Sequence, residues 1–236
     1  MKLKLLALAI TTVVSINASA VSFDYRHEMT DKAGNTHKDR LLMSNRFANG
    51  FGLSMEGKWK GYDDSKDKAF NENVSNGVEA TASWLYKFDK TFAAEAGFNL
   101  VSESGSSNYR PYLRGEAKIV DDVVVSFRYR PFYKRYSSNI GTTRDTSETG
   151  YTLTSYISYD FLQNFNLTYE VEYQKSNSAD FSPIANNESY DWTHDFKLAY
   201  KIDKNWKPYA AIGNVSGSKF TDERQTRFRV GVVYSF

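Results

Sequence analysis

Cationic and aromatic side chains alternate in the segment Phe127–Tyr136, FRYRPFYKRY. Arginine presents a planar fork of N–H donors that matches a carboxylate with two parallel hydrogen bonds, and it stays charged at any working pH. A helix with this alternation would have no apolar face, whereas a strand would place the rings on one face and the fixed charges on the other. The pattern therefore indicates a β-strand with one face of rings and another of fixed positive charge.

Alternation of apolar and polar residues recurs from position 21 to position 236, and it predicts strands with two unlike faces. The predicted strands are residues 21–28, 38–47, 51–60, 78–86, 92–100, 109–119, 123–134, 151–160, 165–173, 191–200, 209–215 and 227–236. No helical pattern separates these twelve segments. In the eleventh, the apolar set is the weakest and consists of Tyr209, Ala211 and Val215.

The connections between the predicted strands alternate between short and long. The short ones are residues 48–50, 87–90, 120–122, 161–163 and 202–205. The longer, polar ones are residues 30–35, 61–71, 103–108, 137–147, 176–187 and 216–222. This rhythm is typical of an up-and-down barrel in the outer membrane, where short periplasmic turns alternate with longer extracellular loops and both termini lie on the short-turn side.

A soluble antiparallel sheet also alternates apolar and polar residues, so other features must decide between the two. Rings stand at the ends of the apolar rows, as at Trp84 and Tyr86 or Tyr169 and Tyr173, which suits girdles at two lipid–water boundaries. The apolar rows carry almost no charge, and the opposite rows are crowded with it. A sheet in hydrocarbon must also close. The sequence thus predicts an all-β fold, a twelve-stranded antiparallel up-and-down transmembrane β-barrel, with a secreted soluble β protein as the alternative.

The first twenty residues have the pattern of a cleaved export signal. Lys2 and Lys4 precede an apolar stretch at residues 5–14, and residues 18–20 read Ala-Ser-Ala. The alternative is an uncleaved buried helix. Without these residues the basic and acidic side chains balance, 30 − 2 = 28 against 28, and the chain has no cysteine for disulfides. We expect residues 21–236 to form one barrel in the bacterial outer membrane.

Counting odd and even positions predicts which cations face the lumen. They are Arg26, Arg40, Arg46, Arg110, Arg114, Arg128, Arg130, Arg227, Arg229, Lys38, Lys58, Lys60, Lys118 and Lys134. The set holds nine of the twelve arginines. Its arginines and lysines lie on strands twelve, one, two and three and, across the ring, on strands six and seven. The predicted inward carboxylates include Glu79, Glu95, Glu170, Glu172, Asp191 and Asp195. We expect two opposed basic stripes separated by acidic or neutral wall.

Two cationic stripes along a pore suit an extended polyanion that passes from site to site, provided that each contact is weak enough to release. Twelve strands give a lumen between the filled eight-stranded barrel and the wide porins. The alternative is that inward arginines pair with inward carboxylates and fill the lumen. That alternative predicts intermixed signs, whereas the stripe hypothesis predicts segregated ones.

Four segments also carry a family resemblance. They read VSFDYRHEM, HKDRLLMSNRFANGF, NYRPYLRGEAKIVDDVVVSFRYRPFYKRY and TRFRVGVVYSF. Along residues 21–236 the chain resembles the KdgM-type oligogalacturonate-specific porins. The resemblance implies a monomeric twelve-stranded channel for acidic oligosaccharides released from pectin, in which the nine arginines serve the sugar carboxylates. Related members carry sialic acids, so a sialic-acid channel is the alternative within the family.

Other residues give weaker signals. Glu170 and Glu172 point the same way from one strand, whereas glycosidases place carboxylates on either side of a bond. Two of the three histidines fall on outward rows, which argues against a metal site or a catalytic triad. Asp63, Asp64 and Asp67 could touch a divalent ion or lipopolysaccharide, although a polar loop explains them as well. Pro111 and Pro131 are expected near the long-loop rim, because proline cannot donate to a ladder.

The expected partners are acidic oligosaccharides, membrane lipid and lipopolysaccharide, and not nucleic acid. We expect no enzymatic activity, no cofactor and no metal ion. An outer-membrane enzyme on a barrel scaffold and a plugged structural barrel remain the alternatives from other functional classes.

Overall fold

The computed structural model describes residues 21–31, 37–61, 70, 72–178 and 183–236. Its strands are β1 (Ser22–Thr30), β2 (Lys38–Arg46), β3 (Phe51–Lys60), β4 (Val74–Lys87), β5 (Phe92–Glu103), β6 (Ser106–Val120), β7 (Val123–Tyr136), β8 (Ser147–Phe161), β9 (Phe165–Ser176), β10 (Tyr190–Tyr200), β11 (Trp206–Ser216) and β12 (Arg224–Ser235). One short 3₁₀ helix, Ser137–Asn139, follows β7. The predicted export signal and the predicted loop aspartates Asp63, Asp64 and Asp67 lie outside the described residues.

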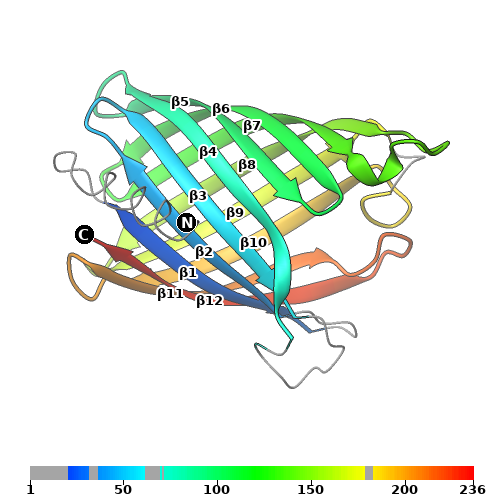
Figure 1. Ribbon diagram of the computed structural model, residues 1–236. Coiled ribbons are helices and arrows are strands. Elements are labelled where there is room, and N and C mark those ends of the chain that lie inside the picture. The colour runs from blue at the N-terminus through cyan, green and yellow to red at the C-terminus, as the bar shows by residue number, and fades with distance from the viewer. Residues whose placement is uncertain (1–20, 32–36, 62–69, 71, 179–182) are drawn as a thin grey trace, which may run out of the picture.

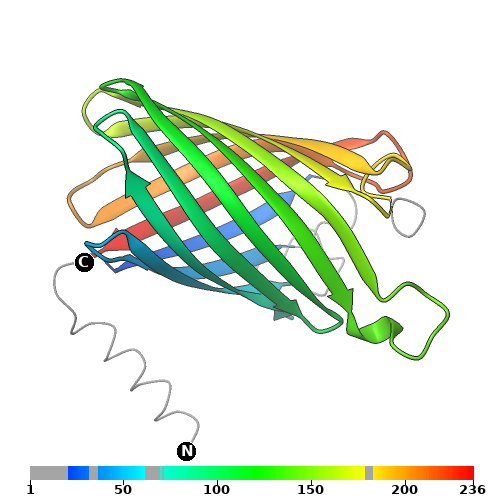
Figure 2. The same ribbon diagram turned by 90° about the horizontal axis from the view of Figure 1, so that it is seen from above.

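Each strand pairs antiparallel with the next one along the chain, and the sheet closes where β1 pairs with β12 from Ser22↔Ser235 to Thr30↔Arg227 (Figure 1). The predicted twelve-stranded up-and-down barrel is confirmed. Among the strands that the structure describes, closure leaves no edge without a partner, which a sheet surrounded by hydrocarbon requires. Figure 2 shows the chain end and the short turns at one end of the barrel, with the longer connections at the other.

The two faces of the strands differ as the alternation predicts. Large apolar side chains such as Met55, Trp84 and Phe98 are exposed on the outside. Rings gather at both ends of the outer face: Phe51 lies 6.1 Å from Trp84 near the short turns, measured between ring centroids. Such girdles mark the two lipid–water boundaries of a membrane barrel. No helix in the described part of the chain has the length and apolar character needed to cross a membrane.

The orientation predicted for the eleventh strand is wrong. Strand β11 begins at Trp206, and its register sets Tyr209 opposite Gly231 and Ala211 opposite Arg229. These residues therefore share the inward face with the arginines of β12. The outward row of β11 is instead Trp206, Pro208, Ala210 and Ile212. The predicted segment began too late to include Trp206, whose outward ring opposite Tyr234 shows that the even positions of this strand face outward.

The connection between β5 and β6 is shorter than predicted. Glu103 pairs with Ser106, which leaves only Ser104 and Gly105 between the two strands where the sequence predicted a loop over residues 103–108. Polar residues of this segment continue the ladder because a long antiparallel pair can extend beyond the membrane into water. Composition alone does not separate such an extension from a loop.

Pro111 and Pro131 lie within paired strands and not at the rim, so their predicted position is wrong. Strands β6 and β7 pair at Tyr109↔Tyr133 on one side of the prolines and at Leu113↔Tyr129 on the other. No register pair joins the two strands in between. Because the prolines stand opposite each other, their missing N–H donors interrupt the ladder at one place instead of two.

Candidate pore site

The strand register places the fourteen predicted cations on inward positions, where cross-strand ion pairs hold most of them. Lys60, at the long-loop end of β3, lies near Glu103 and Tyr136. Lys118 stands apart from the others, because it is exposed and pairs with Asp121 in a short turn at 3.1 Å. The arginines and the remaining lysines form two walls.

The first wall comprises the inward cations of β12, β1, β2 and β3. Arg40 contacts Asp24 at 2.5 Å and Glu56 at 3.3 Å, and Glu28 lies 3.8 Å from Arg26 and 3.6 Å from Lys38. The sequence prediction omitted these three carboxylates from the lumen, although their positions follow from the same alternation. The first wall is therefore interspersed with acids, so the predicted segregation of signs is wrong for this wall, which shows the intermixed signs of the ion-paired alternative.

The end of the first wall on β12 is bound to β10. Arg229 contacts Asp195 at 2.5 Å, and Arg227 donates a hydrogen bond to the same carboxylate. Asp195 is buried, with 4% of its surface exposed. A buried carboxylate that holds two guanidinium groups fixes both of them against the wall.

The second wall comprises the inward cations of β6 and β7. Arg114 contacts Glu95 at 2.5 Å, and Arg110 contacts Glu79 at 2.9 Å while its Nε donates to Asn99 at 2.6 Å. The remaining pairs of this wall are Arg128–Glu172 at 3.9 Å, Arg130–Glu172 at 3.8 Å and Lys134–Glu103 at 3.7 Å.

Acidic residues on β4 and β5 join the two walls. Glu95 contacts Arg46 of β2 at 3.0 Å as well as Arg114 of β6, and Glu79 contacts Lys58 of β3 at 3.5 Å as well as Arg110. On the other side of the barrel, the carboxylates lie on β9 and β10. The order of basic and acidic strands around the ring follows the predicted one, but ion pairs cross every boundary. Basic walls and an ion-paired interior coexist in this pore.

Inward glycines provide recesses in which long side chains lie along the wall. A Cβ atom on Gly97 would stand 2.4 Å from the ring of Tyr112, and one on Gly52 would stand 2.6 Å from the guanidinium of Arg46. The hydroxyl of Tyr112 then donates to Glu95 at 2.7 Å. Side chains that lie flat over glycine do not cross the lumen, which keeps room for a solute beside the charged walls.

The sequence reasoning missed two further inward cations, Lys197 of β10 and Lys207 of β11. Lys197 was placed on an inward row but was not assigned a role. Lys207 was missed because the predicted eleventh strand began at residue 209 and had its odd positions facing outward. Both are exposed although they face the lumen. Neither forms an ion pair with any carboxylate of the described residues. The run of inward odd positions from Lys207 to Gly213 is the signal that could have found Lys207.

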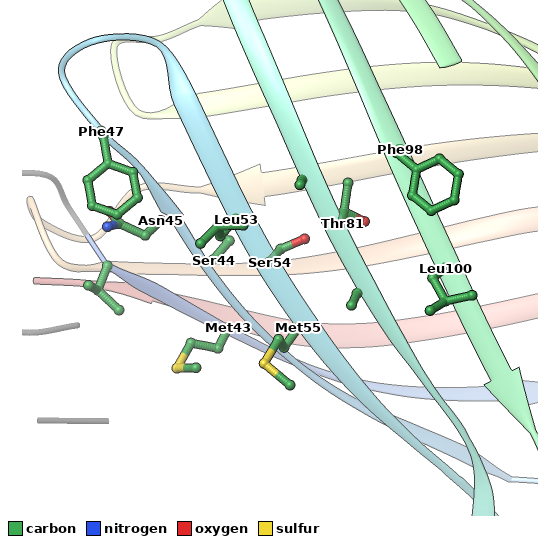
Figure 3. Close-up of a pocket in the computed structure, with 13 residues that line it drawn as sticks. Met43, Ser44, Asn45, Phe47, Leu53, Ser54, Met55, Thr81, Phe98 and Leu100 are labelled. Carbon is green, nitrogen blue, oxygen red and sulfur yellow. The ribbon is translucent and has the colours of Figure 1, made fainter. Parts of the chain in front are cut away.

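An apolar groove lies on the outer face and not in the pore (Figure 3). Its volume is about 430 Å³. Leu53 and Met55 border it on one side and Phe98 and Leu100 on the other, and the small residues of β4 form its floor. This surface faces hydrocarbon in a membrane and offers no charge to an anionic solute.

His27 lies next to His37 and contacts an acidic residue. His27 Nδ1 lies 2.9 Å from Asp39, and His27 Nε2 lies 3.0 Å from His37 Nδ1, on the outward side of β1 and β2. Among the described residues, no group of three or more His, Asp or Glu side chains could hold a metal ion. Glu170 and Glu172 occupy alternate positions of β9, so they share one face as the sequence predicts.

The chain matches one protein family along nearly its whole length. The family described as oligogalacturonate-specific porin protein (KdgM) matches residues 14–236. Among curated proteins, the oligogalacturonate-specific porin KdgM of Dickeya dadantii (strain 3937) is 58% identical over 238 residues, which cover 100% of both chains. The uncharacterized protein YiiY of Salmonella typhimurium is 38% identical over 224 residues, which cover 95% of this chain and 94% of that protein.

Solved structures agree with this match. A KdgM porin has 50% sequence identity and a TM-score of 0.70, covering 92% of this chain and 99% of the other. A KdgM porin in complex with disordered oligogalacturonate has 49% identity and a TM-score of 0.68, with the same coverage. The NanC porin has a TM-score of 0.73 at 18% identity, covering 93% of this chain and 100% of the other, and it supports the fold alone.

Proposed function

This chain belongs to the family of oligogalacturonate-specific porins, and on that premise we propose that it is a passive outer-membrane channel for oligogalacturonates. The family is one of porins, which are channels and not enzymes, and its members are bacterial outer-membrane proteins. The substrate class comes from the relatives that carry this name. No energy source and no catalytic step form part of the proposal.

The observation that carries the proposal is the pair of arginine walls inside a closed barrel. The side chains of the nine inward arginines are between 14% exposed, at Arg130, and 38% exposed, at Arg46, so part of each faces the bore. Each guanidinium has five N–H donors, more than one wall carboxylate can occupy. An uronate carboxylate can therefore share an arginine with its wall partner.

Sharing also explains how a solute can leave. A hydrogen bond to a charged group contributes roughly 1.5–3 kcal/mol net. When a solute carboxylate takes such a bond from a wall carboxylate, the net gain is only the difference in free energy between the two hydrogen bonds. Each contact is then weak, as conduction through a chain of sites requires. A linear polyuronate exposes one carboxylate per sugar, so it can move lengthwise by exchanging one arginine for the next.

The surroundings of the channel follow from the same proposal. Membrane lipid and lipopolysaccharide cover the outer face, and a single chain forms the complete pore, so no second copy is needed. Residues 1–20 serve as the cleaved export signal, and residues 21–236 form the barrel.

Purified protein in a planar bilayer tests the proposal. Under a salt gradient we expect open steps with an anion-selective reversal potential, and trigalacturonate should block the current more strongly than sialic acid at equal concentration. A silent bilayer would favour a plugged structural barrel, stronger block by sialic acid would reassign the substrate, and release of reducing ends from galacturonate oligomers would reveal an enzyme.

A further inference from the structure

A hollow of about 530 Å³ opens from the lumen at the short-turn half of the barrel. Residues of β1, β2, β9, β10, β11 and β12 line it, and its two lysines are Lys197 and Lys207. Small-ligand sites have volumes of roughly 300–1,000 Å³. The hollow is therefore large enough for one or two sugar units.

The lysines in this hollow differ from the arginines of the walls. Wall arginines lie against the barrel and are bound by carboxylates, whereas Lys197 and Lys207 are exposed inside the lumen. Within the described residues, neither lysine has a carboxylate close enough for an ion pair. Their charge is thus available to a solute without displacing a wall acid.

The carboxylates of the hollow are largely engaged elsewhere. Asp24 accepts hydrogen bonds from Arg40 at 2.5 Å and from the hydroxyl of Tyr209 at 2.8 Å, and Asp195 holds the two arginines of β12. Glu170 also lines the hollow and makes no ion pair with the described residues. It is the acid that would weaken anion binding here.

Tyr209 positions Lys197. Its ring lies over Gly231, where a Cβ atom would come within 2.5 Å of the ring, and its hydroxyl is tied to Asp24. The ammonium of Lys197 stands 5.8 Å from the centre of this ring, within the range of a cation–π contact. The ring thus keeps the ammonium over the hollow without neutralising it.

Lys207 lies at the periplasmic mouth. It pairs with Val233 of β12, and the next residue before it, Trp206, packs its ring 4.7 Å from Tyr234 in the girdle near the short turns. The order from the arginine walls toward this mouth is therefore Arg229, Tyr209 level with Gly231, and then Lys207.

We infer that Lys197 and Lys207 form a carboxylate-binding station at the periplasmic mouth, separate from the arginine walls, which takes an anionic oligosaccharide as it leaves them. The inference rests on the proposed function and makes it more specific, because it states that the two ends of the pore bind the same polyanion differently. Lysine is a flexible point charge that does not bind bidentately, so the station holds carboxylates loosely and releases them into the periplasm.

Block of single channels by trigalacturonate, added to one chamber at a time, tests this station. The chain has no cysteine, so a single Ser104→Cys change in the β5–β6 turn lets a charged, membrane-impermeant thiol reagent report which chamber faces the long loops. In Lys197→Gln/Lys207→Gln we expect the on-rate of block from the periplasmic chamber to fall on the order of tenfold, with the on-rate from the other chamber unchanged. Lys197→Arg/Lys207→Arg should retain the on-rate, and Glu170→Gln should raise it.

The matched control is Lys90→Gln/Lys204→Gln, which removes two charges from exposed short turns on the same side of the membrane but outside the hollow. An equal loss of the periplasmic on-rate in this control would show a general effect of surface charge and would overturn the inference. A periplasmic on-rate within twofold of the parent in the Lys197→Gln/Lys207→Gln channel would also overturn it. Absence of block of the parent from either chamber would instead sink the proposed function.

Discussion

Pro111 of β6 faces Pro131 of β7 in a gap of the ladder between Tyr109↔Tyr133 and Leu113↔Tyr129. Neither proline can donate a backbone hydrogen bond, so the ladder at this seam between β6 and β7 lacks these two donors. The seam runs beside Arg110 and Arg130, which makes it a weak place in the second wall.

Closing this gap should stabilise the barrel. In Pro111→Val/Pro131→Val both N–H donors return, and at roughly 0.5–1.5 kcal/mol each we expect a gain of about 1–3 kcal/mol in the free energy of unfolding. Urea unfolding in lipid vesicles, followed by tryptophan fluorescence, measures the gain. Pro183→Val, in the long β9–β10 connection, serves as the control and should change little; a loss of stability in the double variant would show that the seam needs its prolines.

Removal of the carboxylate that holds two arginines should strengthen solute binding. In Glu172→Gln, Arg128 and Arg130 lose their shared partner and become available to trigalacturonate, so we expect the concentration for half block to fall by roughly three- to tenfold. The control Glu116→Gln removes an equal charge from β6, the strand next to the arginines of β7, where the carboxylate accepts a hydrogen bond from Tyr156 at 2.9 Å. Equal effects of the two changes would argue for net charge alone and against arginine sharing.

Neutralising the two arginines themselves should have the opposite effect. Arg128→Gln/Arg130→Gln removes both inward arginines of β7, so anion selectivity and the flux of trigalacturonate into liposomes should both fall. The reversal potential under a salt gradient gives the selectivity, and release from loaded liposomes gives the flux. An unchanged flux would contradict a role for this wall.

A methyl group on Gly97 should narrow the pore. Its Cβ would meet the ring of Tyr112 at 2.4 Å, so the ring must swing toward the lumen and its hydrogen bond to Glu95 must lengthen. We expect Gly97→Ala to lower the single-channel conductance. Gly115→Ala adds the same methyl where no atom lies within 4 Å and should leave the conductance unchanged; a parent-like Gly97→Ala channel would show that Tyr112 can move along the wall.

The turn between β10 and β11 should confer a pH dependence on stability. Backbone N–H groups of Asn205 and Trp206 donate to Asp203 at 2.7 and 2.8 Å, and they lower the pKa of this carboxyl below its usual value of 3.8. A pKa that is lower in the folded state stabilises the fold above the unfolded pKa, and this contribution disappears as the pH falls through the folded pKa. The stability difference between the parent and Asp203→Ala should therefore be present at pH 7 and vanish toward pH 2 in urea titrations; a difference that persists at pH 2 would point to another cause.

The sequence predicts the barrel well because a membrane strand has only two environments. The position of a residue such as Phe127 or Arg128 in the alternation decides which face of the strand it occupies. The inward and outward faces are predicted correctly for eleven of the twelve strands. Strand β11 failed because Tyr209 is an aromatic residue in the lumen, where it packs on a glycine of the next strand. That contact depends on Gly231, which lies 22 positions further along the chain.

The sequence predicts which side chains of the candidate site face the lumen, but it does not predict the ion pairs that they form. Alternation places Arg46, Arg114 and Glu95 inside the barrel, but it does not say that one carboxylate bridges two walls. Such a choice of partner depends on strand tilt and on side-chain reach across the bore. The lysines of β10 and β11 became visible only when the ion pairs identified which cations were already engaged.

The shared carboxylates make the pore a filter for valence. A monovalent anion that meets an arginine gains little, because it replaces a wall acid of the same charge. An oligomer with many carboxylates makes several such exchanges at once on one tether, and avidity multiplies their small gains. If the channel carries polyuronates as proposed, chloride and other small anions do not reside long in the bore, and the polyuronates meet little competition from the salt around them.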